Sequence, residues 1–163
     1  MKLAGCWSVA LAPETGDLKN LKKINKDLTL DSVEHAAELC RKLDMFFRVF
    51  IILGFPFDTP QSIQETDDFI KKINPDLLTV NLYTPFPKTT LYEQYHLDSK
   101  MDTGYYEIPH KDFIKKAFQR MTVFFYLHPR TISKCIRHLS LKQFFNVYMQ
   151  YIRLFLTYRM KTR

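Results

Sequence analysis

Three short apolar runs, separated by amphipathic segments, constrain the fold of this 163-residue chain more than any other feature. They cover residues 3–11, 46–53 and 77–83. The second and third runs are almost continuously apolar, as in strands that are covered on both faces. Strands that alternate with helices indicate β–α units around a parallel sheet. We therefore predict an α/β fold in which three parallel strands follow the order of the sequence.

Helix start signals stand between these runs. Thr29 caps a helix that ends near Asp44, and Pro60 occupies the first turn of a second helix that stops at Asn74. Both segments place their apolar residues on one stripe, so we expect crossover helices between parallel strands. Right-handed crossovers place such helices on one face of the sheet. A shorter helix is expected over residues 19–26.

After about residue 104 the chain has only helical patterns, and its charge changes as well. Residues 1–100 contain 12 Lys/Arg and 14 Asp/Glu, whereas residues 101–163 contain 12 and 3, and no acidic residue follows Asp112. A segment whose charges are almost all positive favours an anionic partner. We expect an α/β unit over residues 1–97 and a basic helical extension over residues 98–163. The helices expected in it are residues 111–127, 130–139 and 141–159.

Aromatic residues recur at helical spacing in the last of these helices, and they allow two interpretations. They could pack against the rest of the fold, or they could face a membrane surface. A nucleic acid is a less favoured partner, because no recognition motif is present. The stripe consists of Phe144, Tyr148, Tyr151, Phe155 and Tyr158.

The cysteine and histidine residues give no metal-binding pattern. Cys6, Cys40 and Cys135 are too far apart for a local zinc or cluster motif, and we interpret them as buried apolar residues in a reducing cytoplasm. His128 and His138 have no ligand partners at suitable spacing, so roles at helix ends are favoured. We expect neither a membrane-spanning helix nor a cleaved signal peptide.

The loops that follow the three apolar runs contain polar residues, glycines and prolines of the kind found in ligand-binding loops. Ligand sites of parallel sheets form where such loops meet, at the carboxyl ends of the strands. Their order and spacing resemble those of radical S-adenosylmethionine enzymes, including the cobalamin-type members. The matching stretches are Glu14-Thr15-Gly16, Leu53-Gly54-Phe55-Pro56 and Thr84-Pro85-Phe86-Pro87.

This resemblance implies the second half of a partial TIM-type (β/α) barrel, followed by the helical extension. In the intact enzyme it implies S-adenosylmethionine and a [4Fe–4S] cluster as cofactors, with cobalamin as an option, and 5′-deoxyadenosyl-radical chemistry. The chain would supply part of the cofactor and substrate surface. By resemblance and position, the cofactor-binding residues are Glu14, Thr15, Leu53, Gly54, Asn81 and Tyr83.

Each of these assignments has a simpler alternative. The Glu14 carboxylate could accept hydrogen bonds from a ribose or an amino group, or it could be a solvated turn residue. Gly54 would let the backbone approach an adenine, or it is an ordinary turn glycine. Asn81 and Tyr83 share a strand face and line a pocket only if that face looks into the barrel. Arg48 either meets a carboxylate or extends to solvent from the start of its strand.

The chain also departs from the family. Phe57 and Lys88 stand where the family usually has glycine, and Asp58 replaces a glutamate. The Cys-x3-Cys-x2-Cys loop that binds the cluster is absent from the printed sequence. We therefore expect the chain to be inactive alone, as a fragment, a split gene product or a degenerate relative. Its partner would be a missing N-terminal barrel half or a second copy; the alternative is a non-catalytic module bound to an anionic surface.

Overall fold

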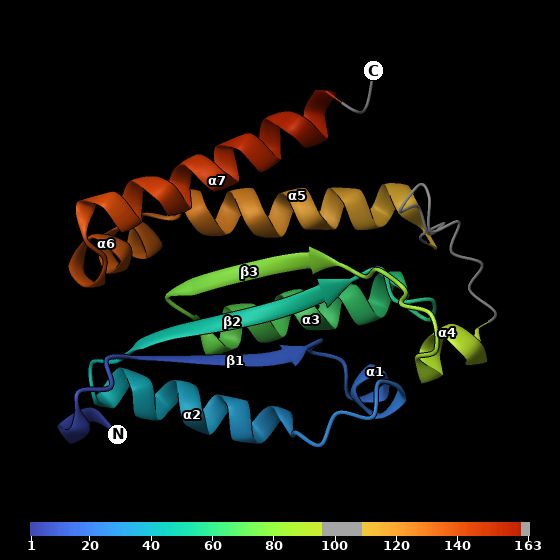
Figure 1. Ribbon diagram of the computed structural model, residues 1–163, viewed down its shortest axis with the longest axis horizontal. Helices are drawn as coiled ribbons and strands as arrows, with labels where there is room; N and C mark the ends of the chain where they lie inside the picture. Colours follow the sequence, from blue (N-terminus) through green and yellow to red (C-terminus); the bar gives the residue numbers. More distant parts are fainter. Residues whose placement is uncertain (96–108, 161–163) are drawn as a thin grey trace.

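The fold is built on a three-stranded parallel sheet. The computed structural model describes residues 1–95 and 109–160. The strands β1 (Ser8–Glu14), β2 (Phe46–Leu53) and β3 (Leu77–Leu82) lie in the order β1-β2-β3, with β2 in the centre (Figure 1). Both strand pairs are parallel, with Val9 beside Phe47 and Val49 beside Leu78. The α/β class and the strand order predicted from the sequence are confirmed.

The start of the first strand was predicted wrongly. Residues 2–4 form a short 3-10 helix, η1 (Lys2–Ala4), which ends at Gly5 in the left-handed region (φ 85°). This turn removes the first residues of the apolar run from the sheet, and Leu3 is fully exposed. At its other end β1 extends to Glu14, with an irregularity in the register between Leu11 and Glu14.

Helices, joined by loops, form most of the rest of the described chain. The capping signals worked as predicted: the Thr29 hydroxyl accepts the Ser32 N–H, and Thr59 and Ser62 form a reciprocal capping box. Asn74 ends its helix in the left-handed region (φ 45°). The helices are α1 (Leu18–Lys23), α2 (Leu30–Lys42), α3 (Pro60–Ile73), α4 (Thr90–Gln94), α5 (Lys111–Leu127), α6 (Pro129–His138) and α7 (Leu141–Met160).

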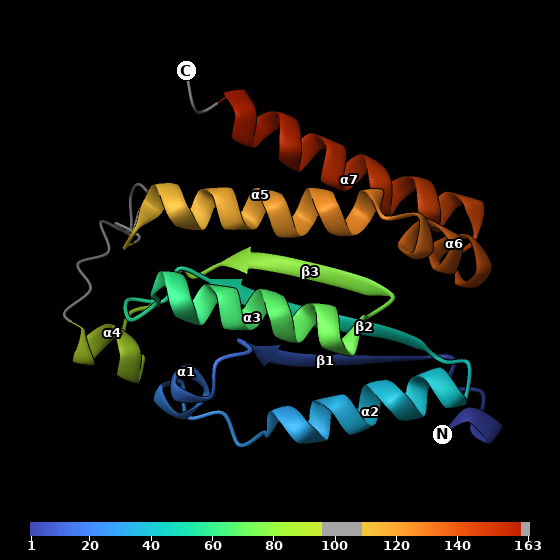
Figure 2. The same ribbon diagram turned by 180° about the vertical axis from the view of Figure 1, so that it is seen from behind.

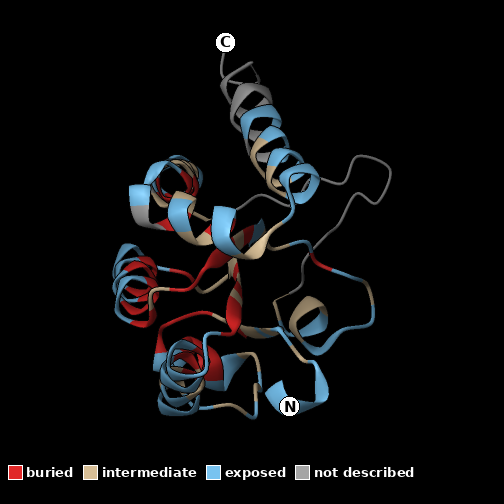
Figure 3. Ribbon diagram, turned by 90° about the vertical axis from the view of Figure 1, so that its left-hand side faces the viewer, coloured by how far each residue is buried: buried red, intermediate tan, exposed pale blue. Residues whose placement is uncertain are grey.

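Three of the helices, α2, α3 and α5, cover one face of the sheet (Figures 2 and 3). Alternate residues of β2 point into this layer and are 0–3% exposed: Phe47, Val49, Ile51 and Leu53. The residues between them, such as Arg48 and Phe50, are only partly buried, and Ala10 on β1 and Asn81 on β3 are exposed. We call this second side the bare face of the sheet. Helices on one face were predicted from the right-handed crossovers.

The end of α5, together with α6 and α7, packs at the amino-terminal ends of β2 and β3. The Tyr126 hydroxyl of α5 donates a hydrogen bond to the Leu78 carbonyl. Phe46, Leu77, Tyr126 and Cys135 form a second buried cluster, to which Phe144 and Tyr148 of α7 add. The expected domain boundary between residues 97 and 98 lies outside the described residues, and the division stays a prediction.

Two of the three cysteines are buried apolar residues, as predicted: Cys40 and Cys135. Cys6 is only partly buried. Within residues 1–95 and 109–160, no helix has the length and apolar character needed to cross a membrane.

Candidate functional site

The loops after β1, β2 and β3 meet at one end of the molecule, where the strand arrows end (Figure 1). The short helices α1 and α4 lie at this end as well. This is the edge at which parallel sheets bind ligands. We call this group of loops the strand-end site.

Asp58 is the centre of the strand-end site. Its Oδ2 accepts the N–H groups of Gly54 at 2.7 Å and Phe55 at 3.0 Å. Its Oδ1 accepts the side-chain amide of Asn20 at 2.9 Å and, more weakly, the Ser62 hydroxyl at 3.4 Å. One buried carboxylate therefore holds the turn after β2, the start of α3 and the start of α1 in a fixed arrangement.

Burial raises the pKa of Asp58, while the hydrogen bonds from Gly54, Phe55 and Ser62 act in the opposite direction, and nearby Asp17 raises it further. The carboxylate is thus used for backbone support rather than exposed to a ligand. Gly54 adopts φ 90°, a left-handed conformation in which glycine avoids the strain of a side chain. Gly54 is buried and its N–H is bonded to Asp58, so the turn after β2 is held in place from inside the fold.

Glu14 lies at the end of β1 with an unusual backbone conformation. Its φ of 68° is in the left-handed region, which is costly for a residue with a side chain. Its carboxylate pairs with Lys26 at 3.1 Å, and its side chain keeps 20% exposure. Glu14 is therefore positioned and accessible, and a ligand amino or hydroxyl group would compete with Lys26 for its oxygens.

Thr15 and Leu53 point away from the bare face. The Thr15 hydroxyl lies 3.1 Å from the Thr66 hydroxyl of α3 and accepts the Asp17 N–H at 3.2 Å. The Leu53 side chain is part of the main core between sheet and helices. A cofactor contact of these two residues stays a prediction, and it would have to involve their backbone atoms.

Gly16 is required by the close packing of the loop against α3. A Cβ at this position would lie 2.6 Å from the Phe69 Cβ and 2.8 Å from the Thr66 Cα. The Gly16 N–H also donates to the Thr66 hydroxyl at 3.0 Å. This glycine therefore seats the Glu14-Thr15-Gly16 turn directly on the helix.

Aromatic rings line the other side of the strand-end site. Phe55 and Phe57 are stacked with 5.3 Å between ring centroids, and Tyr83 lies 5.0 Å from Phe55. Tyr95 lies 5.7 Å from Phe57, and the Lys23 ammonium sits 4.7 Å above the same ring. Phe55 is only 3% exposed, so the part of this ring cluster that a ligand could reach is formed by the partly buried Phe57 and Tyr83.

Asn81 and Tyr83 lie at the end of β3. Tyr83 continues the β2–β3 ladder through its N–H, which donates to the Leu53 carbonyl at 2.8 Å, so the strand period places both residues on the bare face. Asn81 is exposed, and burial raises the pKa of Tyr83. These two residues therefore lie together at the strand ends, next to the stacked rings.

The two departures from glycine have different effects. Lys88 adopts φ 67°, the left-handed conformation that glycine would favour, so the turn keeps its shape at an energetic cost. Phe57 is absent from the residues with positive φ and instead contributes its ring to the stack. At this position the chain therefore has an aromatic side chain in a backbone conformation that does not require glycine.

Arg48 has an incomplete set of partners on the bare face. Its guanidinium lies 5.6 Å from the Phe50 ring, and within the described part of the chain its buried Nε has no hydrogen-bond acceptor. Buried polar atoms are normally paired. Neither of the two predicted roles of Arg48 gives this atom a partner.

The donor set does not fit an iron–sulfur cluster. Cys40 and Cys135 are buried in two different core clusters. In residues 1–95 and 109–160, no three His, Cys, Asp or Glu side chains are grouped as a metal site requires. His138 is the last residue of α6 and its ring lies tilted against Phe46 with 5.5 Å between centroids, and His128 follows the last turn of α5, as expected for helix-end residues.

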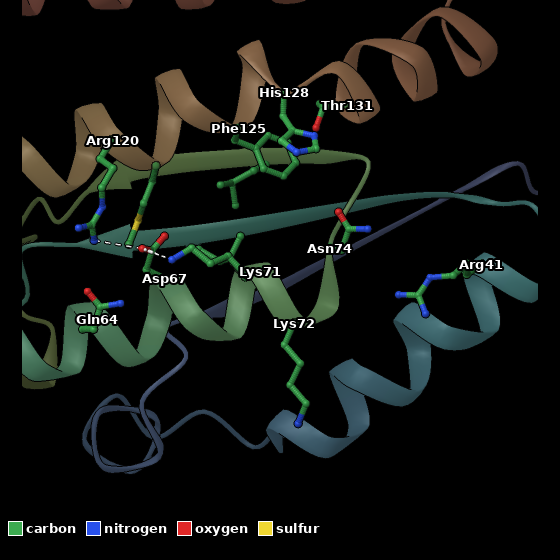
Figure 4. Close-up of a pocket in the computed structure, with 13 residues that line it drawn as sticks. Arg41, Gln64, Asp67, Lys71, Lys72, Asn74, Arg120, Phe125, His128 and Thr131 are labelled. Atoms are coloured by element: carbon green, nitrogen blue, oxygen red, sulfur yellow. Dashed lines mark hydrogen bonds and ion pairs between the residues drawn. The ribbon is translucent and has the colours of Figure 1, made fainter.

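The structure also has a cavity of about 660 Å³ on the helical side, between α3, α5 and α6 (Figure 4). Its central charge is Asp67, which pairs with Arg120 at 3.0 Å and Lys71 at 2.9 Å. None of the six predicted cofactor residues lines it. The apolar part of the lining consists of Ile70, Leu78, Met121 and Phe125. This cavity is therefore separate from the strand-end site and has its main charges already paired.

Comparison with known proteins gives several distant relatives. An uncharacterized methyltransferase of Pyrococcus horikoshii is 26% identical over 148 residues, which cover 83% of this chain and 32% of the relative. The anaerobic magnesium-protoporphyrin IX monomethyl ester cyclase of Cereibacter sphaeroides is 30% identical over 56% of this chain and 15% of its own length. The bacteriochlorophyllide d C-12(1)-methyltransferase of Chlorobaculum tepidum is 30% identical over 63% and 24%. No protein-family model matches.

These relatives are enzymes by name, and at a coarse level they support a relationship to radical S-adenosylmethionine enzymes. The chain spans no more than about a third of the length of each of the three relatives. The similarity therefore concerns one portion of those proteins.

Sequence reasoning missed the roles of Asp58, Phe57 and Lys23. Asp58 directly precedes the Thr59 cap of α3, and an acidic residue between a strand-end glycine and a helix cap is a signal that could have identified it. Phe55 and Phe57 are two apart, which could have suggested a shared side. Lys23 gave no comparable signal, because its ring contact joins segments distant in the sequence.

Proposed function

We propose that this chain is the C-terminal portion of a radical S-adenosylmethionine enzyme and contributes cofactor and substrate surface to a barrel completed by another segment. The bare face of the sheet is the main support for this proposal. Ala10 and Asn81 are exposed on it, and Arg48 and Phe50 are only partly buried. A half-barrel has this form, because its helices lie outside and its inner strand face needs a further strand layer or ligand.

Three residues of the strand-end site would contact the cofactor in this proposal. Glu14 would accept hydrogen bonds from the ribose or amino group of S-adenosylmethionine in place of Lys26. Tyr83, beside the Phe55 and Phe57 rings, would border the adenine, and Asn81 would offer its amide on the substrate side. Asp58 would position the Gly54 turn without touching the cofactor.

The partner of the bare face would be an N-terminal barrel half, and a second copy of the chain is the alternative. The iron–sulfur cluster, and cobalamin where it is used, would be held by that other segment. A search of the coding sequence adjacent to Met1 for an in-frame or neighbouring Cys-x3-Cys-x2-Cys segment would test this part of the proposal directly.

Titration of the chain with S-adenosylmethionine, followed by hydrogen exchange and calorimetry, tests the cofactor surface. We expect added protection at Gly54, Phe55 and Tyr83. Glu14→Gln should weaken binding about tenfold, because a charge-assisted hydrogen bond becomes a neutral one. Glu38→Gln, on the exposed side of α2, is the matched control and should bind as the parent does. No protection at these residues, or equal binding by both variants, would contradict the proposed role of the strand-end site.

A further inference from the structure

An apolar stripe lies exposed along α7, on a different side from the one that packs against the fold. Its residues are large and far from buried: Leu141 at 88%, Phe145 at 65%, Met149 at 37% and Ile152 at 49% exposure. Their spacing of four, four and three positions keeps them on one side of the helix. We call this set the α7 stripe.

The packed side of α7 is made of other residues. Phe144 and Tyr148 lie 4.4 Å apart and belong to the second core cluster with Val147. The Tyr148 hydroxyl donates to the Tyr126 carbonyl at 3.2 Å. Of the predicted aromatic stripe, these two residues do pack against the fold, and the side chains of Tyr151, Phe155 and Tyr158 are outside the described set. The α7 stripe is therefore additional to the surface that stabilises the helix.

The charge around the α7 stripe identifies the kind of surface that would cover it. No acidic residue follows Asp112, and residues 113–163 contain 11 Lys/Arg. Lys142 and Arg137 are exposed near the start of α7, where Leu141 and Phe145 are also exposed. Helical spacing places Lys142 next to the stripe and opposite the packed side.

We infer that the α7 stripe binds the surface of a membrane that contains anionic lipids. A helix with large apolar residues on one side and cations beside them lies in the plane of the lipid interface, with its apolar side among the acyl chains. The cations then contact the lipid phosphates. A protein or RNA partner explains the charge less completely: RNA uses the cations but does not require an aliphatic stripe.

Vesicle co-sedimentation of the full 163-residue chain tests this inference. We expect binding to phosphatidylcholine vesicles that contain phosphatidylserine, weak binding to phosphatidylcholine alone, and release by salt. Phe145→Ser with Met149→Ser should weaken binding by more than about tenfold, because two apolar side chains no longer enter the lipid. Leu39→Ser, at a 43% exposed position on α2, is the matched control and should bind normally.

A second pair of variants keeps the test independent of folding defects. Lys142→Gln with Arg137→Gln should lower binding to the anionic vesicles and leave the circular dichroism spectrum and the thermal stability unchanged. The control, Lys19→Gln with Lys22→Gln, should change neither vesicle binding nor thermal stability. Absence of vesicle binding by the parent chain would overturn the inference. The inference would also be overturned if the chain bound a single-stranded RNA through Lys142 but not through Phe145. A dimer that Phe145→Ser with Met149→Ser dissociates, while vesicle binding stays the same, would overturn it as well.

Discussion

The side-chain amide of Asn20 donates a hydrogen bond to Asp58 Oδ1 at 2.9 Å, and both residues are buried. Asn20 lies in α1, and Asp58 lies in the loop between β2 and α3. This bond therefore joins the loop after β1 to the loop after β2. The relative position of Glu14 and Gly54, the two residues proposed to approach the cofactor, depends on it.

Removal of this bond should destabilise the protein. Asn20→Ala leaves a buried carboxylate oxygen with only the weak Ser62 contact, so we expect the free energy of unfolding to fall by about 1–3 kcal/mol. Urea denaturation followed by circular dichroism measures it. Asn146→Ala, at an exposed position of α7, is the control. An unchanged denaturation midpoint for Asn20→Ala would show that the bond does not hold the two loops together.

Gly16→Ala should be more harmful than Gly5→Ala. The new Cβ at position 16 would lie 2.6 Å from the Phe69 Cβ, so α3 must shift, at a cost of about 1–3 kcal/mol. At Gly5 nothing lies within 4 Å, and only the left-handed φ of 85° opposes alanine, at a cost of about 1–2 kcal/mol. Thermal denaturation and hydrogen exchange separate the two cases. Loss of protection at Thr66 and Phe69 is expected for Gly16→Ala alone, and equal protection there in both variants would refute the close-packing explanation.

Stability should fall at alkaline pH because of Cys135. Burial and then nearby Asp76 raise the pKa of its thiol to about 11, with Lys134 acting in the opposite direction. The unfolded chain loses this proton near the ordinary pKa of 9.0, whereas the folded chain keeps it. The contribution of the protonated Cys135 thiol to stability is thus complete below about pH 9 and lost by about pH 11. The free energy of unfolding should fall by roughly 2–3 kcal/mol over this range.

The variant Cys135→Val isolates this effect. It should remove most of the decrease between pH 9 and pH 11, as measured by urea denaturation at a series of pH values. Tyr148, whose pKa burial raises to about 12, should still produce a decrease above pH 10. The same slope in Cys135→Val and in the parent chain would mean that another group is responsible.

The chain alone should not assemble a [4Fe–4S] cluster. Cys40 and Cys135 lie in separate buried clusters, and no group of three ligands exists among the described residues. Anaerobic reconstitution with iron and sulfide, followed by desalting and iron analysis, should therefore leave no stoichiometric iron. A stable broad charge-transfer absorbance with iron in a fixed ratio to protein would disprove this prediction.

The edge of β1 and the bare face should make the isolated chain self-associate. β1 pairs only with β2 in the described sheet, and its other edge presents unpaired backbone groups. We expect sedimentation velocity to show concentration-dependent dimers or larger species. Ala10→Lys with Ala12→Lys, on the bare face, should reduce this association, whereas Leu39→Lys on α2 should not. A monomer at all concentrations, with strong hydrogen-exchange protection over β1, would favour a self-sufficient binding module.

Local sequence determined the order and limits of most elements. Thr29 and Thr59 mark helix starts that the structure confirms, because a cap depends only on residues within one turn. The run over residues 46–53 specifies its strand through near-continuous apolar content. The positive charge of the helical extension also followed from the sequence, since it depends only on the number of basic and acidic residues.

Tertiary structure decided which side of each element is used. Leu53 and Asn81 were both predicted as cofactor-binding residues, yet one enters the core and the other is exposed, because the helix layer covers only one face of the sheet. On α7, helical spacing alone could not separate the packed Phe144 and Tyr148 from the exposed Phe145 and Met149. The Asn20–Asp58 hydrogen bond could not be predicted from the sequence, because it joins residues that only the tertiary structure brings together. Periodicity fixes where side chains point relative to their own backbone, whereas burial and pairing depend on partners that are distant in the sequence.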